Sequence, residues 1–150
     1  MLPLNAKQIS YQDVGDTVWK HKQVIEKYAQ DKVISFDIVI SKLRNGIHAG
    51  SIVSTYLRLP FGVVEVNPAD GTTSILWPTD VDRTKPLNVL AVDTVSNSGT
   101  SLQDMVAGIL KEQSNAQVHT YATFVAAKSL YKPSIQGEVI TDYIQTPWEW

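Results

Sequence analysis

The sequence predicts an α/β fold: one domain with a Rossmann-like, mostly parallel sheet flanked by helices. Short β-branched runs at 36–40 and 87–92 are typical of strands that are covered on both faces. These runs alternate with segments whose apolar residues recur at helical spacing. Strands that alternate with helices form βαβ units, so consecutive strands are expected to pair in parallel. The length of 150 residues is the usual size of one domain.

The first half of the chain predicts two helices and up to three strands. Apolar residues between Val14 and Tyr28 fall mostly at helical spacing, and Ser10 or Asp13 is a suitable cap. Two turn signals, Asn67-Pro68 and Asp70-Gly71, close the run at 61–66. The expected elements are a helix at 10–30, a strand at 36–40, a helix at 47–58, a strand at 61–66 and a short strand at 72–77.

The second half begins with the most convincing buried strand, residues 87–92. A helix is expected at 101–112 and another strand at 117–127. From residue 132 the pattern becomes irregular, and we expect a core of about 10–127 followed by a small C-terminal hood at 128–150. Ligands of such sheets lie at the carboxyl ends of the strands, which points to the segments after Ile40 and Val92.

Composition narrows the function classes. Hydrophobic residues make up 43% and charged residues 19%, and the formal net charge of -2 gives no basic surplus for nucleic acid. There are no cysteines, which excludes disulfides, thiolate zinc sites and thiol catalysis. We expect a cytoplasmic protein without a signal peptide or membrane span. His21, His48 and His119 have no metal-binding spacing and are expected to be surface or packing residues.

Small polar residues follow the strand that ends near Val92. Residues 94–101 contain five hydroxyl side chains and one glycine, and they lead into a helix. Small side chains let backbone N–H groups face a ligand, and the helix N-terminus adds partial positive charge. A plain Ser/Thr-capped turn is the alternative, but it does not account for the carboxylate of Asp93 at the strand tip. The segment therefore predicts a phosphate site.

This segment also carries a family resemblance. Residues 89–101, VLAVDTVSNSGTS, resemble the phosphoribosyl-pyrophosphate motif of the type I phosphoribosyltransferases. In that family the motif is a hydrophobic strand, two acids, two apolar residues and a Thr/Gly-rich phosphate loop. The resemblance implies that Asp93 holds the ribose hydroxyls and a magnesium ion, and that 98–101 hold the 5′-phosphate. The implied donor-binding residues here are Asp93, Thr94, Val95, Ser96, Asn97, Ser98, Gly99, Thr100 and Ser101.

Two positions depart from the family motif. Thr94 stands at the second acid, and Asn97 stands at the acid that precedes the phosphate loop. In 6-oxopurine members that latter acid manages the proton on N7 of the base, a general-base role that asparagine cannot take. The sequence leaves open whether another acid, such as Glu65 from a neighbouring strand, replaces the acid missing at Thr94.

Residues 36–47, FDIVISKLRNGI, resemble the family's first strand and pyrophosphate loop. Arg44 matches the arginine of that loop and Gly46 its second glycine. Asn45 replaces the first glycine, and asparagine accepts positive φ better than most residues. The arginine offers a fork of donors to a diphosphate, although by itself it also reads as a solvated turn residue. The resemblance implies pyrophosphate binding by Leu43, Arg44, Asn45 and Gly46, with Arg44, Asp93 and Asn97 as catalytic residues.

The C-terminal segments 130–133 and 142–149 resemble the base-binding hood of xanthine–guanine-type members. The resemblance implies that Lys132, which precedes a proline, donates to the 6-oxo group of a purine. It also implies stacking by Tyr143 and a backbone contact from Ile144. Lys128 is the less expected donor, and Trp148 is expected to pack.

The resemblance implies a purine phosphoribosyltransferase that uses Mg²⁺, phosphoribosyl pyrophosphate and a 6-oxopurine. Homodimers or homotetramers are the usual assemblies of such relatives. The family's flexible lid is expected between 67 and 83, where we find no clear signature. One alternative is a catalytically altered relative that binds a nucleotide or the donor as a sensor. Another is a small α/β domain that works through protein contacts.

Overall fold

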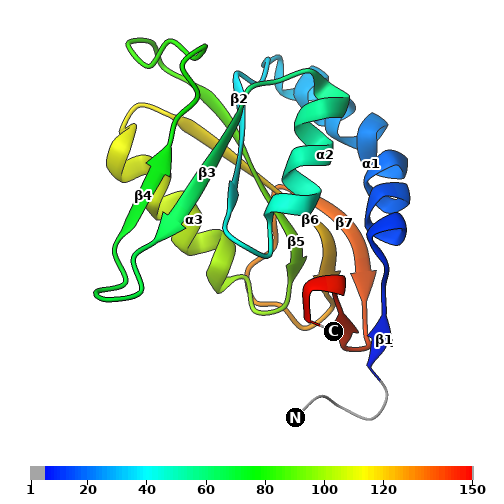
Figure 1. Ribbon diagram of the computed structural model, residues 1–150. Helices are drawn as coiled ribbons and strands as arrows, with labels where there is room; N and C mark the ends of the chain where they lie inside the picture. The colour runs from blue at the N-terminus through cyan, green and yellow to red at the C-terminus, as the bar shows by residue number, and fades with distance from the viewer. Residues whose placement is uncertain (1–5, 150) are drawn as a thin grey trace.

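A six-stranded sheet forms the centre of the computed structural model, which describes residues 6–149 (Figure 1). The strand order is β4-β3-β2-β5-β6-β7, and all neighbours are parallel except β3 and β4. The α/β prediction is therefore confirmed. The strands are β2 (Ile38–Lys42), β3 (Phe61–Val66), β4 (Thr73–Leu76), β5 (Asn88–Ser96), β6 (Gln117–Ala126) and β7 (Ile135–Ile140).

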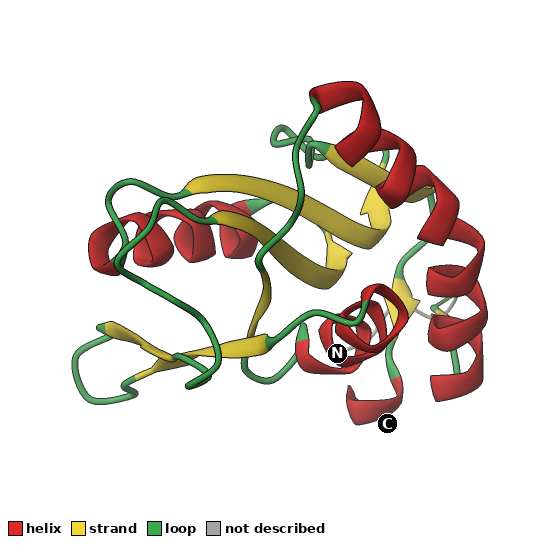
Figure 2. Cartoon of the chain, turned by 90° about the horizontal axis from the view of Figure 1, so that it is seen from above, coloured by secondary structure: helices red, strands yellow, loops and turns green. Residues whose placement is uncertain are grey.

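Helices cover both faces of the sheet (Figure 2). On one face α1 (Tyr11–Lys32) and α2 (Ile47–Leu57) pack on a core that includes Leu90 and Tyr121. On the other face α3 (Thr100–Glu112) packs on a core that includes Val89 and Ala122. Because β2 and β5 are covered on both faces, each contains a continuous apolar run, Ile38–Ile40 in β2 and Val89–Val92 in β5.

The first helix shows how its sequence sets its ends. The Ser10 Oγ accepts from the Asp13 N–H at 3.0 Å, and the Asp13 carboxylate accepts from the Ser10 N–H at 2.7 Å. Both expected caps thus act together as a capping box. The helix ends at Val33, which adopts the left-handed conformation with φ 55°.

Two strands differ from the sequence prediction. Strand β5 continues to Ser96, because Val95 and Ser96 still pair with β6. Asp93 and Thr94 therefore lie inside the sheet and not beyond its end. Residues 135–140, expected to be irregular, form β7 at the parallel edge. Most of its side chains are at least partly exposed, which removes the apolar signal of a buried strand.

A second, two-stranded sheet joins the two ends of the described chain. In it β1 (Lys7–Gln8) pairs in parallel with β8 (Ile144–Gln145). The short 3₁₀ helix η1 (Pro147–Glu149) follows. The Glu149 carboxylate accepts from both the N–H and the hydroxyl of Thr146, each at 2.8 Å. These contacts lie within the tail and close the turn of η1. Of the helices in residues 6–149, none has the length and apolar character needed to cross a membrane.

The loop after β4 is anchored to the end of α3. The guanidinium of Arg83 lies 4.2 Å from the centre of the Trp77 ring, and Trp77 Nε1 donates to Glu112 at 3.1 Å. Gln113 donates to the carbonyls of Arg83 and Lys85 at 3.1 and 3.2 Å. The lid was expected between 67 and 83, and the part of this region that follows β4 is thus fixed to the end of α3. The turn between β3 and β4 lies at the outer edge of the sheet (Figure 1).

Gln113→Ala is expected to lower the free energy of unfolding by about 2 kcal/mol, because it leaves two carbonyls of the loop without their donor. Gln113 is only 6% exposed, so water does not readily replace its amide. Gln103→Ala, at an exposed position on α3, the helix whose C-cap is Gln113, is the matched control and is expected to change stability by less than about 0.5 kcal/mol. Urea denaturation measures both. Equal effects of the two substitutions would contradict the anchoring role.

Candidate functional site

Two loops meet at the carboxyl edge of the sheet because β2 and β5 are adjacent and parallel. Helix α2 begins directly after the first loop and α3 after the second. Neither helix has a side-chain cap, and their N-cap residues are Gly46 and Gly99. Helix α1, by contrast, is fully capped. Two helix N-termini at one edge therefore keep backbone N–H groups available for anions.

The loop before α3 depends on Gly99. Its φ is 91°, a conformation that side chains disfavour, and an added Cβ would lie 2.3 Å from the Cβ of Tyr131. The hydroxyls of Ser98 and Thr100 lie 3.0 Å apart, and the Thr100 N–H donates to Ser98 Oγ at 3.3 Å. Both hydroxyls are exposed beside the start of α3. The conformation of the predicted phosphate loop is thus set by contacts within the chain itself.

Asp93 is a buried carboxylate beneath this loop. It is 4% exposed, and its Oδ1 accepts from the Thr94 N–H at 2.8 Å. Burial raises the pKa of Asp93 from its ordinary 3.8 to about 6. The Thr94 N–H, the positive charge of Lys42 and the Ser101 hydroxyl act in the opposite direction. The group is therefore mainly ionised at neutral pH and takes up a proton in mildly acidic solution.

Thr94 is fully buried, and its hydroxyl has no hydrogen-bond partner within the described chain. Successive side chains of a strand point to opposite faces, so Thr94 points away from the face of Asp93. Glu65 does not take the place of the missing acid, since it lies on β3 and β2 separates β3 from β5. Within residues 6–149, no three acidic or histidine side chains form a metal-binding group.

The loop before α2 packs tightly on the end of β5. A Cβ added to Gly46 would lie 2.9 Å from the Val92 carbonyl oxygen, so this position needs a glycine. The peptide between Leu43 and Arg44 is cis. Asn45 has no positive φ, so the conformational reason given for its presence is wrong. Arg44 is exposed and forms no ion pair with other described residues, which leaves its guanidinium available to a ligand.

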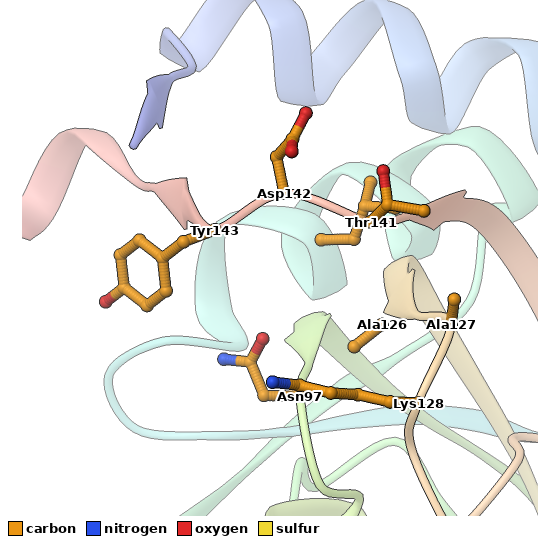
Figure 3. Close-up of a pocket in the computed structure, with 8 residues that line it drawn as sticks. Asn97, Ala126, Ala127, Lys128, Thr141, Asp142 and Tyr143 are labelled. Carbon is orange, nitrogen blue, oxygen red and sulfur yellow. The ribbon is translucent and has the colours of Figure 1, made fainter. Parts of the chain in front are cut away.

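A cavity of about 410 Å³ lies between the end of β6 and the segment before β8 (Figure 3). In Figure 3, Tyr143 lies across from Asn97, and the Lys128 side chain extends toward Asn97. A smaller cavity of about 50 Å³ adjoins it; Asn97 lines both, and Asn45 lines the smaller one. Asn97 thus connects the larger cavity with the loop before α2. The larger cavity is lined by Asn97, Ala126, Ala127, Lys128, Ile140, Thr141, Asp142 and Tyr143.

The structure separates the two lysines considered for base binding. Lys132 does not line the larger cavity; its Nζ donates to the carbonyls of Ala127 at 3.0 Å and Ala126 at 3.4 Å. Lys128 lines the cavity instead. In the sequence, the Lys-Pro pair favoured Lys132 as the lysine that reaches the base. The signal that points to Lys128 is its place directly after the carboxyl end of a predicted strand. Of the other expected residues, Tyr143 lines the larger cavity and the buried Ile144 the smaller one.

The histidines pack as the sequence suggested. His21 Nδ1 lies 2.8 Å from the Tyr121 hydroxyl, and His119 Nδ1 lies 2.8 Å from the Tyr28 hydroxyl. Burial lowers the pKa of both His21 and His119, so both are mainly neutral at pH 7. His48 packs edge-on against aromatic rings, including that of Trp148.

Fold and site together define an α/β domain with two uncapped helix N-termini and a buried carboxylate near the carboxyl edge of its sheet. A comparison with family descriptions identifies this domain further. The chain belongs to the phosphoribosyltransferase family, since the phosphoribosyl transferase domain matches residues 10–150. The predicted family is therefore confirmed. A sequence comparison with curated proteins gave no match.

Solved structures share the fold over almost their whole length. A purine phosphoribosyltransferase from Pyrococcus horikoshii has a TM-score of 0.75 at 19% identity, covering 98% of this chain and 96% of that one. A xanthine-guanine-hypoxanthine phosphoribosyltransferase from Helicobacter pylori has a TM-score of 0.74 at 15% identity, covering 97% and 94%. A hypothetical protein from Neisseria gonorrhoeae with bound ppGpp has a TM-score of 0.68 at 19% identity, covering 97% and 90%.

Proposed function

We propose that this chain is a purine phosphoribosyltransferase. It would transfer 5-phosphoribose from phosphoribosyl pyrophosphate to a 6-oxopurine base and release pyrophosphate. The observation that carries the proposal is the convergence of a buried carboxylate, two uncapped helix N-termini and a cavity at one sheet edge. The bond between C1 of the ribose and the pyrophosphate oxygen breaks, a bond from C1 to a ring nitrogen of the base forms, and the imidazole proton of the base is released.

The donor would occupy the two loops. The N–H groups at the start of α3, with the hydroxyls of Ser98 and Thr100, suit the 5′-phosphate. Asp93 suits the ribose hydroxyls, which are donors for a carboxylate. The start of α2 and the guanidinium of Arg44 suit the leaving pyrophosphate, whose developing charge they would stabilise.

Magnesium fits this arrangement as a partner of the donor. Mg²⁺ is usually held by one or two carboxylates together with substrate phosphates and water. Asp93 is the one acid that this edge offers among the sequence-predicted site residues, so the ion would reach the site with its diphosphate. When bound, it would neutralise charge on the pyrophosphate.

The base would occupy the cavity of about 410 Å³. Tyr143 offers an aromatic face for stacking, while Ala126, Ala127 and Ile140 supply apolar walls. The ammonium of Lys128 only donates hydrogen bonds, which favours an oxo group over an amino group at the edge it meets. This assignment replaces Lys132 with Lys128 as the donor to the 6-oxo group.

Lys128→Ala is expected to raise KM for the base by about 10-fold or more, because a charged hydrogen bond is worth about 1.5–3 kcal/mol. Lys132→Ala is the matched control at the same surface. It is expected to leave KM for the base within about threefold while lowering the melting temperature, because it removes a donor from two carbonyls at the end of β6. Initial rates at saturating donor and thermal melts measure both effects. The reverse pattern would restore Lys132 as the base contact.

Thr94 and Asn97 favour a second candidate, a relative that binds a nucleotide without turnover. Both replace family acids, while the phosphate loop and the cavity are retained. The related fold in the Neisseria gonorrhoeae protein holds ppGpp, a guanine nucleotide, and is of unassigned activity. A sensor of this kind would bind GMP or ppGpp at the same edge of the sheet.

One assay separates the two candidates. Purified protein is incubated with phosphoribosyl pyrophosphate and Mg²⁺, and separately with guanine, xanthine, hypoxanthine, adenine, uracil or orotate, and nucleotides are resolved by chromatography. Formation of an oxopurine nucleotide that stops on chelation of the metal supports the transferase. No product with any base, together with calorimetric binding of GMP or ppGpp, supports the sensor.

A further inference from the structure

Lys42 is the last residue of β2, the strand next to the one that carries Asp93. The parallel register pairs Ser41 with Val92, so the next position places Lys42 opposite Asp93. The residues two positions before them, on the same faces of their strands, both belong to the core under α3. Lys42 and Asp93 therefore project side by side to the α3 face of the sheet.

The ammonium of Lys42 acts on the Asp93 carboxylate without forming an ion pair with it. Burial raises the pKa of Asp93, and the positive charge of Lys42 is among the influences that oppose this rise. The side chain of Lys42 is half-buried, and within residues 6–149 it forms no ion pair. Its charge therefore lies near Asp93 and remains available to a ligand that reaches the carboxylate.

Lys42 also lines a cavity of about 360 Å³ between α3 and the turn that joins β3 to β4. Asp104 and Lys111 are the other charged residues of this cavity, and both are exposed on α3. The cavity leaves room beside the ammonium, so a phosphate group can approach it without displacing the core. Lys42 thus adjoins three features: Asp93, the loop before α2 that follows it in the chain, and this cavity.

The donor brings dense negative charge to this part of the site. Its pyrophosphate is expected at the loop before α2 and its ribose at Asp93, so the bond that breaks would lie between these two places. A divalent metal ion commonly neutralises such charge. A lysine ammonium does the same as a point charge. The pair of Asp93 and Lys42 carries no net charge, since Thr94 supplies no second carboxylate, and it attracts a free cation less than two acids would.

We propose that Lys42 is a donor-binding residue, whose ammonium contacts the diphosphate of phosphoribosyl pyrophosphate and takes over part of the charge neutralisation by the metal. This inference rests on the proposed transferase function and adds a further residue to its site. The donor should therefore bind without Mg²⁺, and Mg²⁺ should add more to the affinity when the charge of Lys42 is absent. A lysine that only stabilised the fold would show no such coupling with the metal.

Calorimetric titration with phosphoribosyl pyrophosphate, without a base, tests this coupling. Each protein is titrated once in the presence of a chelator and once with saturating Mg²⁺. Lys42→Met keeps the apolar stem and removes the charge. It should weaken binding by about 10-fold or more in the chelator, because a charged hydrogen bond is lost, and by less than about threefold with Mg²⁺. Lys42→Arg keeps the charge and should stay within about threefold of the native affinity in both conditions.

Lys111→Met is the matched control, because it removes a charge from the same cavity but from a residue that does not lie opposite Asp93. It should change donor affinity by less than about threefold in both conditions, since water and salt screen an exposed charge. A loss equal to that of Lys42→Met would assign the effect to the general charge of the cavity and overturn the proposal. Thermal melts show whether each variant is folded, and Lys42→Gln takes the place of Lys42→Met if that variant melts below the assay temperature.

The outcomes also separate this inference from the function on which it rests. Unchanged donor affinity of Lys42→Met in the chelator, or equal weakening with and without Mg²⁺, would overturn the role of Lys42. Donor binding with the expected coupling, but without nucleotide formation from any base, would support this role and overturn the transferase. Absence of donor binding by the native protein in both conditions would overturn both.

Discussion

Asp93→Asn is expected to lower phosphoribosyl transfer by about 100-fold or more and, at pH 8, to make the protein more stable. Activity falls because the amide removes the charge that would hold the ribose hydroxyls and the donor's metal ion. Stability rises because the carboxylate is buried and its ionisation is unfavourable in the fold. The rise of the pKa of Asp93 from 3.8 to about 6 corresponds to about 3 kcal/mol.

The stability difference has a defined pH dependence. A carboxyl whose pKa is raised by folding contributes stability below the pKa of the unfolded chain, and this contribution is lost as the pH rises through the pKa of the folded state. The advantage of Asp93→Asn should therefore be absent below about pH 4, grow between pH 4 and 6, and be complete above pH 6. Urea denaturation at a series of pH values measures it.

The matched control is Asp104→Asn, an exposed acid on α3. It is expected to change stability by less than about 0.5 kcal/mol at every pH. Donor binding by the native protein should weaken below about pH 6, because Asp93 is then protonated. Retained activity in Asp93→Asn, or a loss of stability at pH 8, would show that the carboxylate does not have this role.

The sequence predicted the helices and the central strands because their signals are local. The capping box of Ser10 and Asp13 and the apolar spacing of α1 are both readable along the chain. The extension of β5 to Ser96 was not readable, because it depends on pairing with Phe124 and Val125 of β6, about 30 residues away. Strand β7 was missed for a related reason: an exposed edge strand has little apolar pattern.

The candidate site likewise has one part that local sequence signals predict and one part that they do not. The phosphate loop was readable because strand, loop and helix follow one another, so that Asp93 and Gly99 belong to one short motif. The cavity brings together three segments far apart in sequence, and no local signal fixes which lysine reaches it. Lys132 and Lys128 differ by four residues in an irregular segment, and only the path of that segment directs Lys128 to Asn97 and Lys132 to the carbonyls of β6.

Gly99→Ala is expected to lower the free energy of unfolding by about 2–4 kcal/mol and to abolish binding of a 5′-nucleotide. The methyl group would force a residue with a side chain into φ 91° and would lie 2.3 Å from the Cβ of Tyr131. Relief of this contact requires the loop to move, which displaces the N–H groups at the start of α3. Denaturation and calorimetry with GMP measure the two effects.

Gly71→Ala is the matched control, because Gly71 also has positive φ, 72°, but has no neighbour within 4 Å of an added Cβ. It carries the backbone penalty alone, about 1 kcal/mol, and should leave nucleotide binding intact. The double variant Gly99→Ala/Tyr131→Gly removes the contact but keeps the backbone penalty. If the contact with Tyr131 holds the loop, the cycle should show a favourable coupling of about 1 kcal/mol or more and partial recovery of binding. Additive effects would instead assign the whole loss of stability in Gly99→Ala to the backbone conformation of residue 99. The contact with Tyr131 would then have no part in the shape of the phosphate loop.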